Sequence, residues 1–354
     1  DDTLQPADPA MRTRMVSAWT VALAYQAVCQ LAHVARRSGE MKRADRLESL
    51  AGSMARDFRE HLMPGGIVAG FLVTEAGGSR PLLHPDDHVT GIRYRLLPMT
   101  RAIIAGLFSP EEARRHLAII ERELRSPDGV RLMSDPVTYR GGIEHWFKRA
   151  DTAANVGREI GLQYVHAHLR YAEALARVGD AGGLWRALQV VNPVGLEASV
   201  PNAALRQSNV YFSSSDADFG DRHEAGARWG ELRLGHVPVR GGWRLYSSGP
   251  GLFIHKVRAC LLGVRESYDG VVFDPVLPRE LDGLMATLLI CGRRTEVSYR
   301  VRDGGGGPAA IRVNGSVVDA QREANPYRRG GLKVPASRLA ALLAEGDNSL
   351  EIDL

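Results

Sequence analysis

Cysteine is scarce in this chain, and neither sign of charge dominates it. The 354 residues include only three cysteines, and they lie far apart in apolar surroundings at positions 29, 260 and 291. An odd number without metal-ligand spacing indicates free thiols of a reducing compartment rather than a disulfide framework or a zinc site. The 45 basic and 41 acidic residues are interspersed and leave a net charge of only +4. So small an excess gives no support to nucleic-acid binding.

Longer signals are missing as well. No apolar run approaches the ~20 residues of a membrane span, and no signal peptide is visible, so we expect a cytoplasmic protein. The sequence lacks the nucleophile elbow, the dinucleotide fingerprint and the P-loop, which leaves serine hydrolase, oxidoreductase and nucleotidase chemistry without support. The chain starts at Asp1 without a methionine, inside what reads as a motif. We therefore expect it to be a fragment.

Helical periodicity fills the first half of the chain. Apolar residues recur at intervals of three and four positions, and they predict helices over 11–37, 41–62, 88–107, 109–125 and 154–178, with a shorter one to about 191. Ser109 followed by Pro110 and two glutamates is typical of a helix start. Helices in succession with loops of mixed length suit an all-α toroid or bundle.

The pattern changes after about residue 266. Short β-rich runs separated by glycine-rich turns predict strands over 271–273, 286–290, 295–301, 310–313 and 350–354. Asn314-Gly315 between two apolar runs favours a hairpin. We interpret this part as a small antiparallel sandwich. The intervening segment 195–248 is polar and predicted to be irregular, and loops of that length are often functional.

Two predicted helix starts, near 158–167 and 241–251, combine polar side chains with backbone N–H groups that attract anions. They predict a site for phosphate or a polyhydroxylated substrate. Simpler interpretations remain open, since His166 is explained equally by a structural role and Ser247-Ser248 by a plain helix cap. A further acidic group is compatible with a metal site or with a solvated, capped loop: Asp216, Asp218, Asp221, His223 and Glu224.

Several motifs stand in a fixed order along the chain: Asp1-Asp2-Thr3, Arg158-Glu159 with Gln163-Tyr164 and His166-Ala167, Asn192-Pro193, Gly241-Gly242-Trp243 with Tyr246-Ser247-Ser248-Gly249, Leu262-Gly263-Val264-Arg265 and Phe273-Asp274-Pro275. Together they resemble the inverting phosphorylases of glycoside hydrolase family 94. The Ser213-Ser214-Ser215-Asp216 stretch and Asn325-Pro326-Tyr327-Arg328 are most similar to the members that act on 1,2-β-oligoglucans.

The resemblance implies a fold and a domain division. Residues 1–265 would be the second half of an (α/α)6-barrel catalytic domain, and residues 266–354 a C-terminal antiparallel β-sandwich. The amino-terminal half of the same polypeptide would be missing. This fragment alone would then be inactive, and a homodimer is one option for the full-length protein.

The resemblance also implies an activity: inverting phosphorolysis of β-1,2-linked glucooligosaccharides that releases α-glucose 1-phosphate. Because phosphate is itself the nucleophile, one carboxylic acid suffices, and no cofactor is expected beyond inorganic phosphate as co-substrate. Roles carried over from the family's motifs make Asp2 the general acid and assign phosphate binding to His166, Ser247 and Ser248. Sugar binding is assigned to four residues: Asp1, Arg158, Glu159 and Gln163.

Two other functions remain open at this point. One is the phosphorylase-like region of a cyclic β-1,2-glucan synthase, for which membrane or glycosyltransferase segments would have to adjoin this region. The other is a non-catalytic carbohydrate-binding fragment. In each case the expected partner is a β-glucan oligosaccharide, with neither nucleic acid nor a bound metal.

Overall fold

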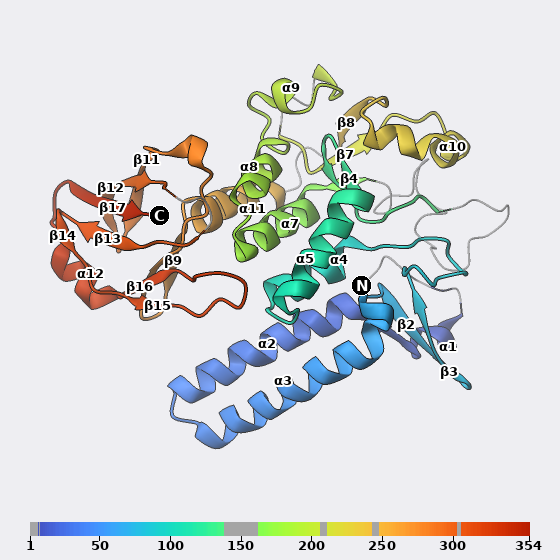
Figure 1. The fold of residues 1–354 in the computed structure, drawn as a ribbon, viewed down its shortest axis with the longest axis horizontal. Coiled ribbons are helices and arrows are strands. Elements are labelled where there is room, and N and C mark those ends of the chain that lie inside the picture. Colours follow the sequence, from blue (N-terminus) through green and yellow to red (C-terminus); the bar gives the residue numbers. More distant parts are fainter. Residues whose placement is uncertain (1–5, 7, 138–161, 206–210, 243–247, 303–305) are drawn as a thin grey trace. The chain divides into compact units, whose positions relative to one another are not determined.

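A computed structural model describes residues 6, 8–137, 162–205, 211–242, 248–302 and 306–354. The chain divides into two compact units, whose boundary falls within one helix. The first unit comprises Asp1–Tyr171 and Val190–Tyr246, and the second comprises Ala172–Gln189 and Ser247–Leu354. Each unit is described separately below, with the element labels of Figure 1.

The first unit begins with a short helix, α1 (Pro9–Arg12), and a long helical hairpin of α2 (Ala18–Arg37) and α3 (Met41–Leu62) (Figure 1). The prediction over 41–62 is confirmed. The prediction over 11–37 places the helix start too early, because Met15–Ser17 forms strand β1 instead. The Ser17 hydroxyl accepts a hydrogen bond from the backbone of Thr20 and caps α2.

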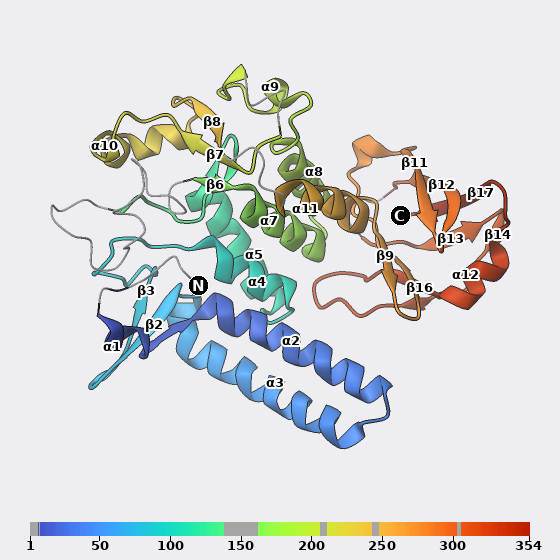
Figure 2. The ribbon, with the colours of Figure 1, turned by 180° about the vertical axis from the view of Figure 1, so that it is seen from behind.

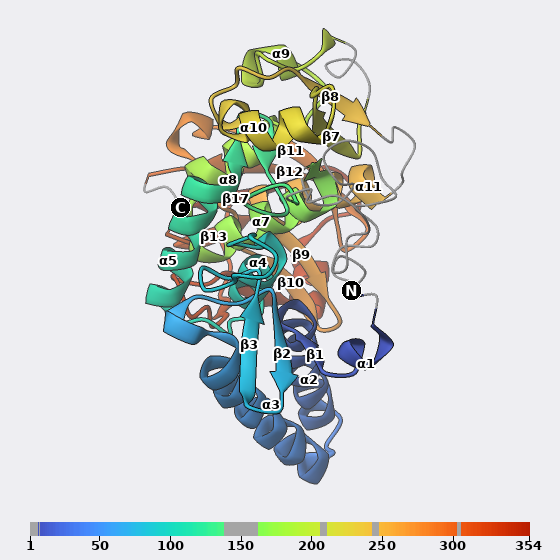
Figure 3. The same cartoon turned by 90° about the vertical axis from the view of Figure 1, so that its right-hand side faces the viewer.

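A small antiparallel sheet that the sequence did not reveal lies beside this hairpin. Strand β2 (Phe71–Glu75) pairs with β1 on one edge and with β3 (Gly78–Leu82) on the other. The strands stand next to α2 and α3 in Figure 3. A 3₁₀ turn at Pro64–Gly66 precedes the sheet. These strands are short, and their apolar residues do not alternate regularly, so a period of two is not detectable there.

Two further helices follow in the first unit. Helix α4 (Leu96–Ile104) begins eight residues later than predicted, with Pro98 in its first turn, where a missing N–H costs nothing. Helix α5 (Pro110–Ile119) carries the predicted start as a full capping box between Ser109 and Glu112. It continues through a π-helical turn to Leu124, close to the predicted end.

Further short antiparallel strands lie in the first unit. Strands β4 (Arg125–Ser126) and β5 (Gly129–Val130) form a tight hairpin. Within the described residues, β6 (Gln163–Tyr164), β7 (Ser214–Ala217) and β8 (Val239–Gly242) form a sheet in that order. The predicted irregular segment 195–248 is thus wrong in part, since it contains two of these strands and the helices α9 (Leu196–Ser199) and α10 (Arg222–Arg233).

The second unit contains the later half of α7 (Val165–Val178), then α8 (Ala181–Gln189) and α11 (Ser248–Lys256), which continues as a π-helical turn over Val257–Leu261. An ion pair of 2.9 Å between Lys256 Nζ and Glu173 Oε2 joins α11 to α7. The Lys256 side chain is only 3% exposed, so the pair is largely shielded from solvent.

The β-rich remainder of the second unit holds two sheets and a helix (Figure 2). The first sheet has the order β15 (Gln321–Arg322), β16 (Leu332–Pro335), β10 (Gly270–Phe273), β9 (Val264–Ser267). The second has the order β11 (Met285–Ile290), β12 (Arg293–Arg300), β17 (Asn348–Asp353), β13 (Ala310–Val313), β14 (Ser316–Val317). A 3₁₀ turn, Arg279–Leu281, and helix α12 (Ala336–Leu342) complete the unit.

Each of the five predicted β-rich runs forms a strand, and the Asn314-Gly315 hairpin joins β13 to β14. Both turn residues have positive φ, 47° and 80°, as a tight hairpin turn requires. The pairing is antiparallel except between β12 and β17, which run parallel. A mixed α and β fold with a β-rich C-terminal part is therefore confirmed. Of the helices described here, none is both long and apolar enough to cross a membrane.

Candidate functional site

Most of the predicted site residues lie outside the described part of the chain. These are Asp1, Asp2, Arg158, Glu159 and Ser247. Ser248 is the first residue of α11, but its side chain is likewise outside the description. Gln163 and His166 remain, on β6 and in the first turn of α7. The predicted convergence of His166 with Ser247 and Ser248 on one phosphate therefore stays a prediction.

Gln163 is placed by the β6–β7 ladder. It pairs with Ser215, and two residues later the backbone N–H of Val165 donates to the carbonyl of Ser213 at 3.0 Å. The Gln163 side chain is fully buried. Among the described residues, neither its Nε2 nor its Oε1 has a hydrogen-bond partner. A buried amide with both ends unused is rare in proteins and needs an explanation.

The β4–β5 hairpin approaches Gln163 through a glycine. Gly129 has φ +123°, and a Cβ at this position would stand 3.0 Å from Gln163 Nε2 and 2.8 Å from the ring nitrogen Nδ1 of His168. The next residue, Val130, donates its backbone N–H to that same His168 nitrogen at 3.2 Å. The absence of a side chain at Gly129 thus lets the hairpin contact both β6 and α7.

A buried ion pair lies at the same hairpin. Arg131 Nη1 is 3.0 Å from Asp128 Oδ2, and the two side chains are 2% and 0% exposed. Within the described residues, Arg131 Nε and Nη2 and Asp128 Oδ1 have no hydrogen-bond partner. Asp216 on β7 interacts electrostatically with both Arg131 and Asp128. Its pKa is raised, mainly because the carboxyl is buried.

Sequence reasoning did not select Asp128 or Arg131. The segment Pro127-Asp128-Gly129 looks like an ordinary turn. An arginine three positions after an aspartate is common on protein surfaces, and only the fold reveals that both are buried. The sequence suggests Asp216 only as a possible metal ligand, which is a different role.

The residues next to Gln163 form an aromatic group. The rings of Tyr164 and His166 are stacked, with centroids 5.9 Å apart and an interplanar angle of 24°. Burial, and to a smaller extent the nearby Tyr164, raises the pKa of Tyr211 well above its ordinary value. The Tyr211 hydroxyl has no partner among the described residues. His166 is thus held against an aromatic ring at the start of α7.

The acidic group over 216–224 has structural partners. Asp221 caps α10 by accepting from the backbone N–H groups of His223 and Glu224. Asp218 pairs with Arg240 at 2.6 Å, and Glu224 accepts from the backbone of Gly220. No cluster suited to a metal ion occurs in the described ranges. The capped-loop interpretation is therefore correct for Asp221, whereas Asp216 lies on strand β7.

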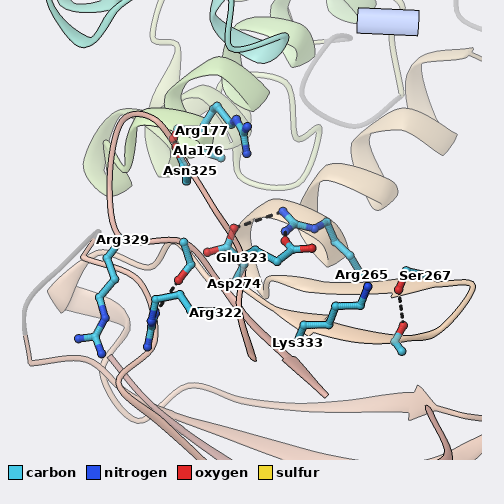
Figure 4. Close-up of polar contacts among 12 residues, drawn as sticks. Ala176, Arg177, Arg265, Ser267, Asp274, Arg322, Glu323, Asn325, Arg329 and Lys333 are labelled. Carbon is cyan, nitrogen blue, oxygen red and sulfur yellow. Dashed lines mark hydrogen bonds and ion pairs between the residues drawn. The ribbon is translucent and has the colours of Figure 1, made fainter. Parts of the chain in front are cut away.

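The motif Asn325-Pro326-Tyr327-Arg328 caps the end of a helix. Asn325 Nδ2 donates to the carbonyl of Arg177 at 3.0 Å, and Arg328 Nε donates to the carbonyl of Ala176 at 3.1 Å. Both acceptors lie in the last turn of α7, where carbonyl groups have no partner within the helix. Figure 4 shows Asn325 beside Ala176 and Arg177, with Arg265 between Asp274 and Glu323 below them.

Comparisons with known proteins agree with the motifs. Residues 263–352 match the family described as glycoside phosphorylase C-terminal domain. Over 341 residues, 96% of this chain, the sequence is 45% identical to a 1,2-β-oligoglucan phosphorylase of Listeria innocua. The chain is a relative of the glycoside phosphorylases. It spans 30% of the length of that Listeria protein.

Two more distant likenesses accompany this relationship. A cyclic β-(1,2)-glucan synthase, NdvB of Rhizobium meliloti, is 27% identical over 222 residues, which are 62% of this chain and 7% of that protein. A solved sialidase chain has a similar fold, with a TM-score of 0.52 at 13% identity over 90% of this chain and 26% of its own length. At that identity the likeness concerns the fold alone. The glycoside phosphorylase relationship rests on the family match over residues 263–352 and on the identity to the Listeria protein.

Proposed function

We propose that this chain is part of an inverting glycoside phosphorylase that cleaves β-1,2-linked glucooligosaccharides and releases α-glucose 1-phosphate. The observation that carries the proposal is the 45% identity to a 1,2-β-oligoglucan phosphorylase over 96% of the chain. The ordered motifs from Asp1 to Arg328 support the same assignment, since several motifs in order are more specific than any one alone.

In the proposed reaction, a phosphate oxygen attacks the anomeric carbon from the α face. The β-glycosidic bond breaks, and the leaving oxygen takes a proton from a carboxylic acid on the opposite side. We assign that acid to Asp2. Phosphate bound nearby favours its protonated form, because a neighbouring negative charge raises the pKa of a carboxyl. Phosphate is already an anion, so no second carboxylate is needed to activate a nucleophile.

We assign phosphate binding to His166, Ser247 and Ser248, and contacts to the sugar to Asp1, Arg158, Glu159 and Gln163. For Gln163 there is structural support, since its buried amide keeps both a donor and an acceptor unused within the described part of the chain. Inorganic phosphate acts as co-substrate, and the chemistry requires no further cofactor.

The same relationship supports an architecture. We assign residues 1–265 to the second half of an (α/α)6 barrel and residues 266–354 to a C-terminal β-sandwich. The chain spans 30% of the length of the Listeria phosphorylase. We propose that the enzyme also contains an amino-terminal half in the same polypeptide. A homodimer stays a prediction for the full-length protein.

The test uses the full-length protein that contains this chain. Purified enzyme is incubated with a β-1,2-linked glucotriose and inorganic phosphate, and released α-glucose 1-phosphate is measured. β-1,3- and β-1,4-linked oligosaccharides are the matched substrates. We expect activity on the β-1,2 linkage and a loss of at least ~10²-fold in Asp2→Asn with unchanged circular dichroism. Near-normal activity of Asp2→Asn contradicts the assignment of the acid, and Asp1→Asn is then the next variant.

A second function, the phosphorylase-like region of a cyclic β-1,2-glucan synthase, is favoured only by the 27% identity to NdvB. The same assay separates the two. A phosphorylase produces free glucose 1-phosphate from linear chains, whereas a synthase produces cyclic β-1,2-glucan. A protein that binds the oligosaccharide but produces neither would be a carbohydrate-binding module.

A further inference from the structure

Five buried polar atoms without partners occur together in the described part of the first unit. They are Arg131 Nε and Nη2, Asp128 Oδ1, and Gln163 Nε2 and Oε1. The three side chains are among the least exposed in the chain. Leaving one buried polar atom unsatisfied costs about 1–3 kcal/mol. Several such atoms in one place indicate that a group other than the described side chains satisfies them.

The atoms belong to one locality. Asp128 adjoins Gly129, where a Cβ would stand 3.0 Å from the Gln163 amide nitrogen. The 3.0 Å pair with Asp128 fixes the guanidinium of Arg131 at the same hairpin. Asp216 lies one residue beyond Ser215, the β-ladder partner of Gln163, and it interacts electrostatically with both Arg131 and Asp128. The cluster thus combines side chains from the β4–β5 hairpin, β6 and β7.

The charge of the cluster restricts what it can bind. Arg131 contributes one positive charge, while Asp128 and Asp216 contribute up to two negative charges. The balance is neutral or negative, so the cluster does not attract phosphate or another small anion. A metal ion is disfavoured beside a guanidinium, and no metal-binding group was found among the described residues.

The unused atoms include both donors and acceptors. Arg131 offers two donor nitrogens, Asp128 offers an acceptor oxygen, and Gln163 offers one donor nitrogen and one acceptor oxygen. A hydroxyl group is the ligand that uses both, because it donates one hydrogen bond and accepts others. Neighbouring hydroxyls on a sugar ring present this alternation in a fixed geometry.

We infer that Asp128, Arg131 and Gln163, with Asp216 beside them, bind the hydroxyl groups of one glucosyl residue of the substrate. Arg131 donates to the sugar oxygens while Asp128 accepts from a hydroxyl. Their ion pair holds both groups in position before the sugar arrives. The identity of the sugar rests on the proposed function, whereas the polyhydroxyl chemistry rests on the cluster alone.

The experiment compares two conservative changes at matched buried ion pairs in the full-length protein. Asp128→Asn removes the charge of a carboxylate that keeps one oxygen free for a ligand. Asp274→Asn also removes the charge of a buried carboxylate, in the second unit. It is the control because both oxygens of Asp274 already accept hydrogen bonds from Arg328. Arg131→Lys and Asp216→Asn complete the set. The readouts are KM for the oligosaccharide, KM for phosphate and the melting temperature.

We expect Asp128→Asn and Arg131→Lys to raise KM for the oligosaccharide about ten- to hundredfold, the loss typical of a hydrogen bond to a charged group. KM for phosphate should change less than about threefold, because a cluster with a neutral or negative net charge does not attract phosphate. Asp274→Asn should lower the melting temperature without this selective effect. Unchanged KM values for the oligosaccharide, or equal shifts for both substrates that follow the melting temperature, overturn the inference.

A binding measurement keeps the inference separate from the proposed function. Calorimetric titration of the full-length protein with β-1,2-glucotriose, in the absence of phosphate, needs no turnover. If wild type binds and Asp128→Asn does not, the subsite stands even when no glucose 1-phosphate is ever formed. If wild type and variant bind equally, or neither binds, the subsite assignment is wrong whatever the activity.

Discussion

Arg328 donates two hydrogen bonds to the carboxylate of Asp274, at 2.8 and 3.1 Å, and both side chains are more than nine-tenths buried. The remaining guanidinium nitrogen, Nε, donates to the carbonyl of Ala176 in the last turn of α7. The Arg328 side chain, 152 residues after Ala176 in the sequence, therefore joins the segment after β10 to the end of α7. Gly331 leaves the space for this arrangement, since a Cβ there would stand 2.6 Å from Asp274 Cβ.

This pair should be essential to the stability of the second unit. Arg328→Ala leaves the Asp274 carboxylate buried with only the weaker Arg265 contact, at 3.3 Å, and leaves the Ala176 carbonyl without this donor. We expect a loss of about 3–5 kcal/mol in the free energy of unfolding, measured by urea denaturation. The neighbouring exposed residue supplies the control: Arg329→Ala should change stability by less than about 0.5 kcal/mol. Equal effects from both variants would show that the buried pair has no special role.

His116 should make the first unit sensitive to mild acid. Its side chain is fully buried, accepts a hydrogen bond from the backbone of Val68, and has a pKa lowered by burial to about 4. Between about pH 6.5 and 4 the unfolded chain binds a proton that the folded chain does not, so stability falls as the pH falls through this window. The contribution is about 3 kcal/mol at most.

Urea titrations across pH 4–7 measure this effect, with His116→Gln compared with wild type. The variant should lose stability overall but show a shallower decline with acid. His61→Gln, at a side chain that is 55% exposed, is the matched control for the substitution itself. A wild-type profile that is flat between pH 6.5 and 4 contradicts the prediction.

Alanine substitutions at Gly263 and Gly292 should distinguish the cost of a steric clash from the cost of a left-handed backbone. Both have left-handed backbones, with φ of 68° and 76°. A Cβ on Gly263 would stand 1.9 Å from the backbone nitrogen of Pro275, whereas a Cβ on Gly292 meets nothing within 4 Å. Gly292→Ala should therefore cost about 1–2 kcal/mol, the strain of the conformation alone. Gly263→Ala should cost clearly more, because the backbone of Pro275 must move. Comparable melting temperatures for the two variants would contradict this difference.

His166→Ala tests the proposed phosphate site in the full-length enzyme. Loss of one charge-assisted hydrogen bond costs about 1.5–3 kcal/mol, which corresponds to a rise of ten- to a hundredfold or more in KM for phosphate. KM for the oligosaccharide should change far less. Tyr164→Phe serves as the control, since it keeps the ring that stacks on His166. A loss confined to the sugar would place His166 in a sugar subsite.

Local signals in the sequence were reliable where one short segment determines the structure. Ser109 and Glu112 cap α5 as their spacing predicted, and Asn314-Gly315 forms its turn because both residues tolerate positive φ. Long amphipathic runs such as 41–62 gave correct helix bounds for the same reason. In each of these cases the decisive contacts lie within a few residues along the chain.

Features that depend on distant partners were not visible. Strand β1 was read as helix because its apolar residues continue the helical spacing, and only pairing with β2 decides otherwise. The cluster of Asp128, Arg131 and Gln163 comes from segments more than thirty residues apart. Sequence composition does not reveal that the Asp128–Arg131 pair is buried. Motif resemblance selected Gln163 as a candidate but gave no indication of Asp128 or Arg131.

The parallel pairing of β12 with β17 has a consequence for the order of synthesis. Residues 295–300 pair with residues 348–353, and β17 also supplies the other partner of β13. While a ribosome makes this chain, β12 and β13 emerge before their shared neighbour exists. The five-stranded sheet therefore cannot close until residue 353 has left the exit tunnel, and its strand edges remain open to other nascent chains during that interval.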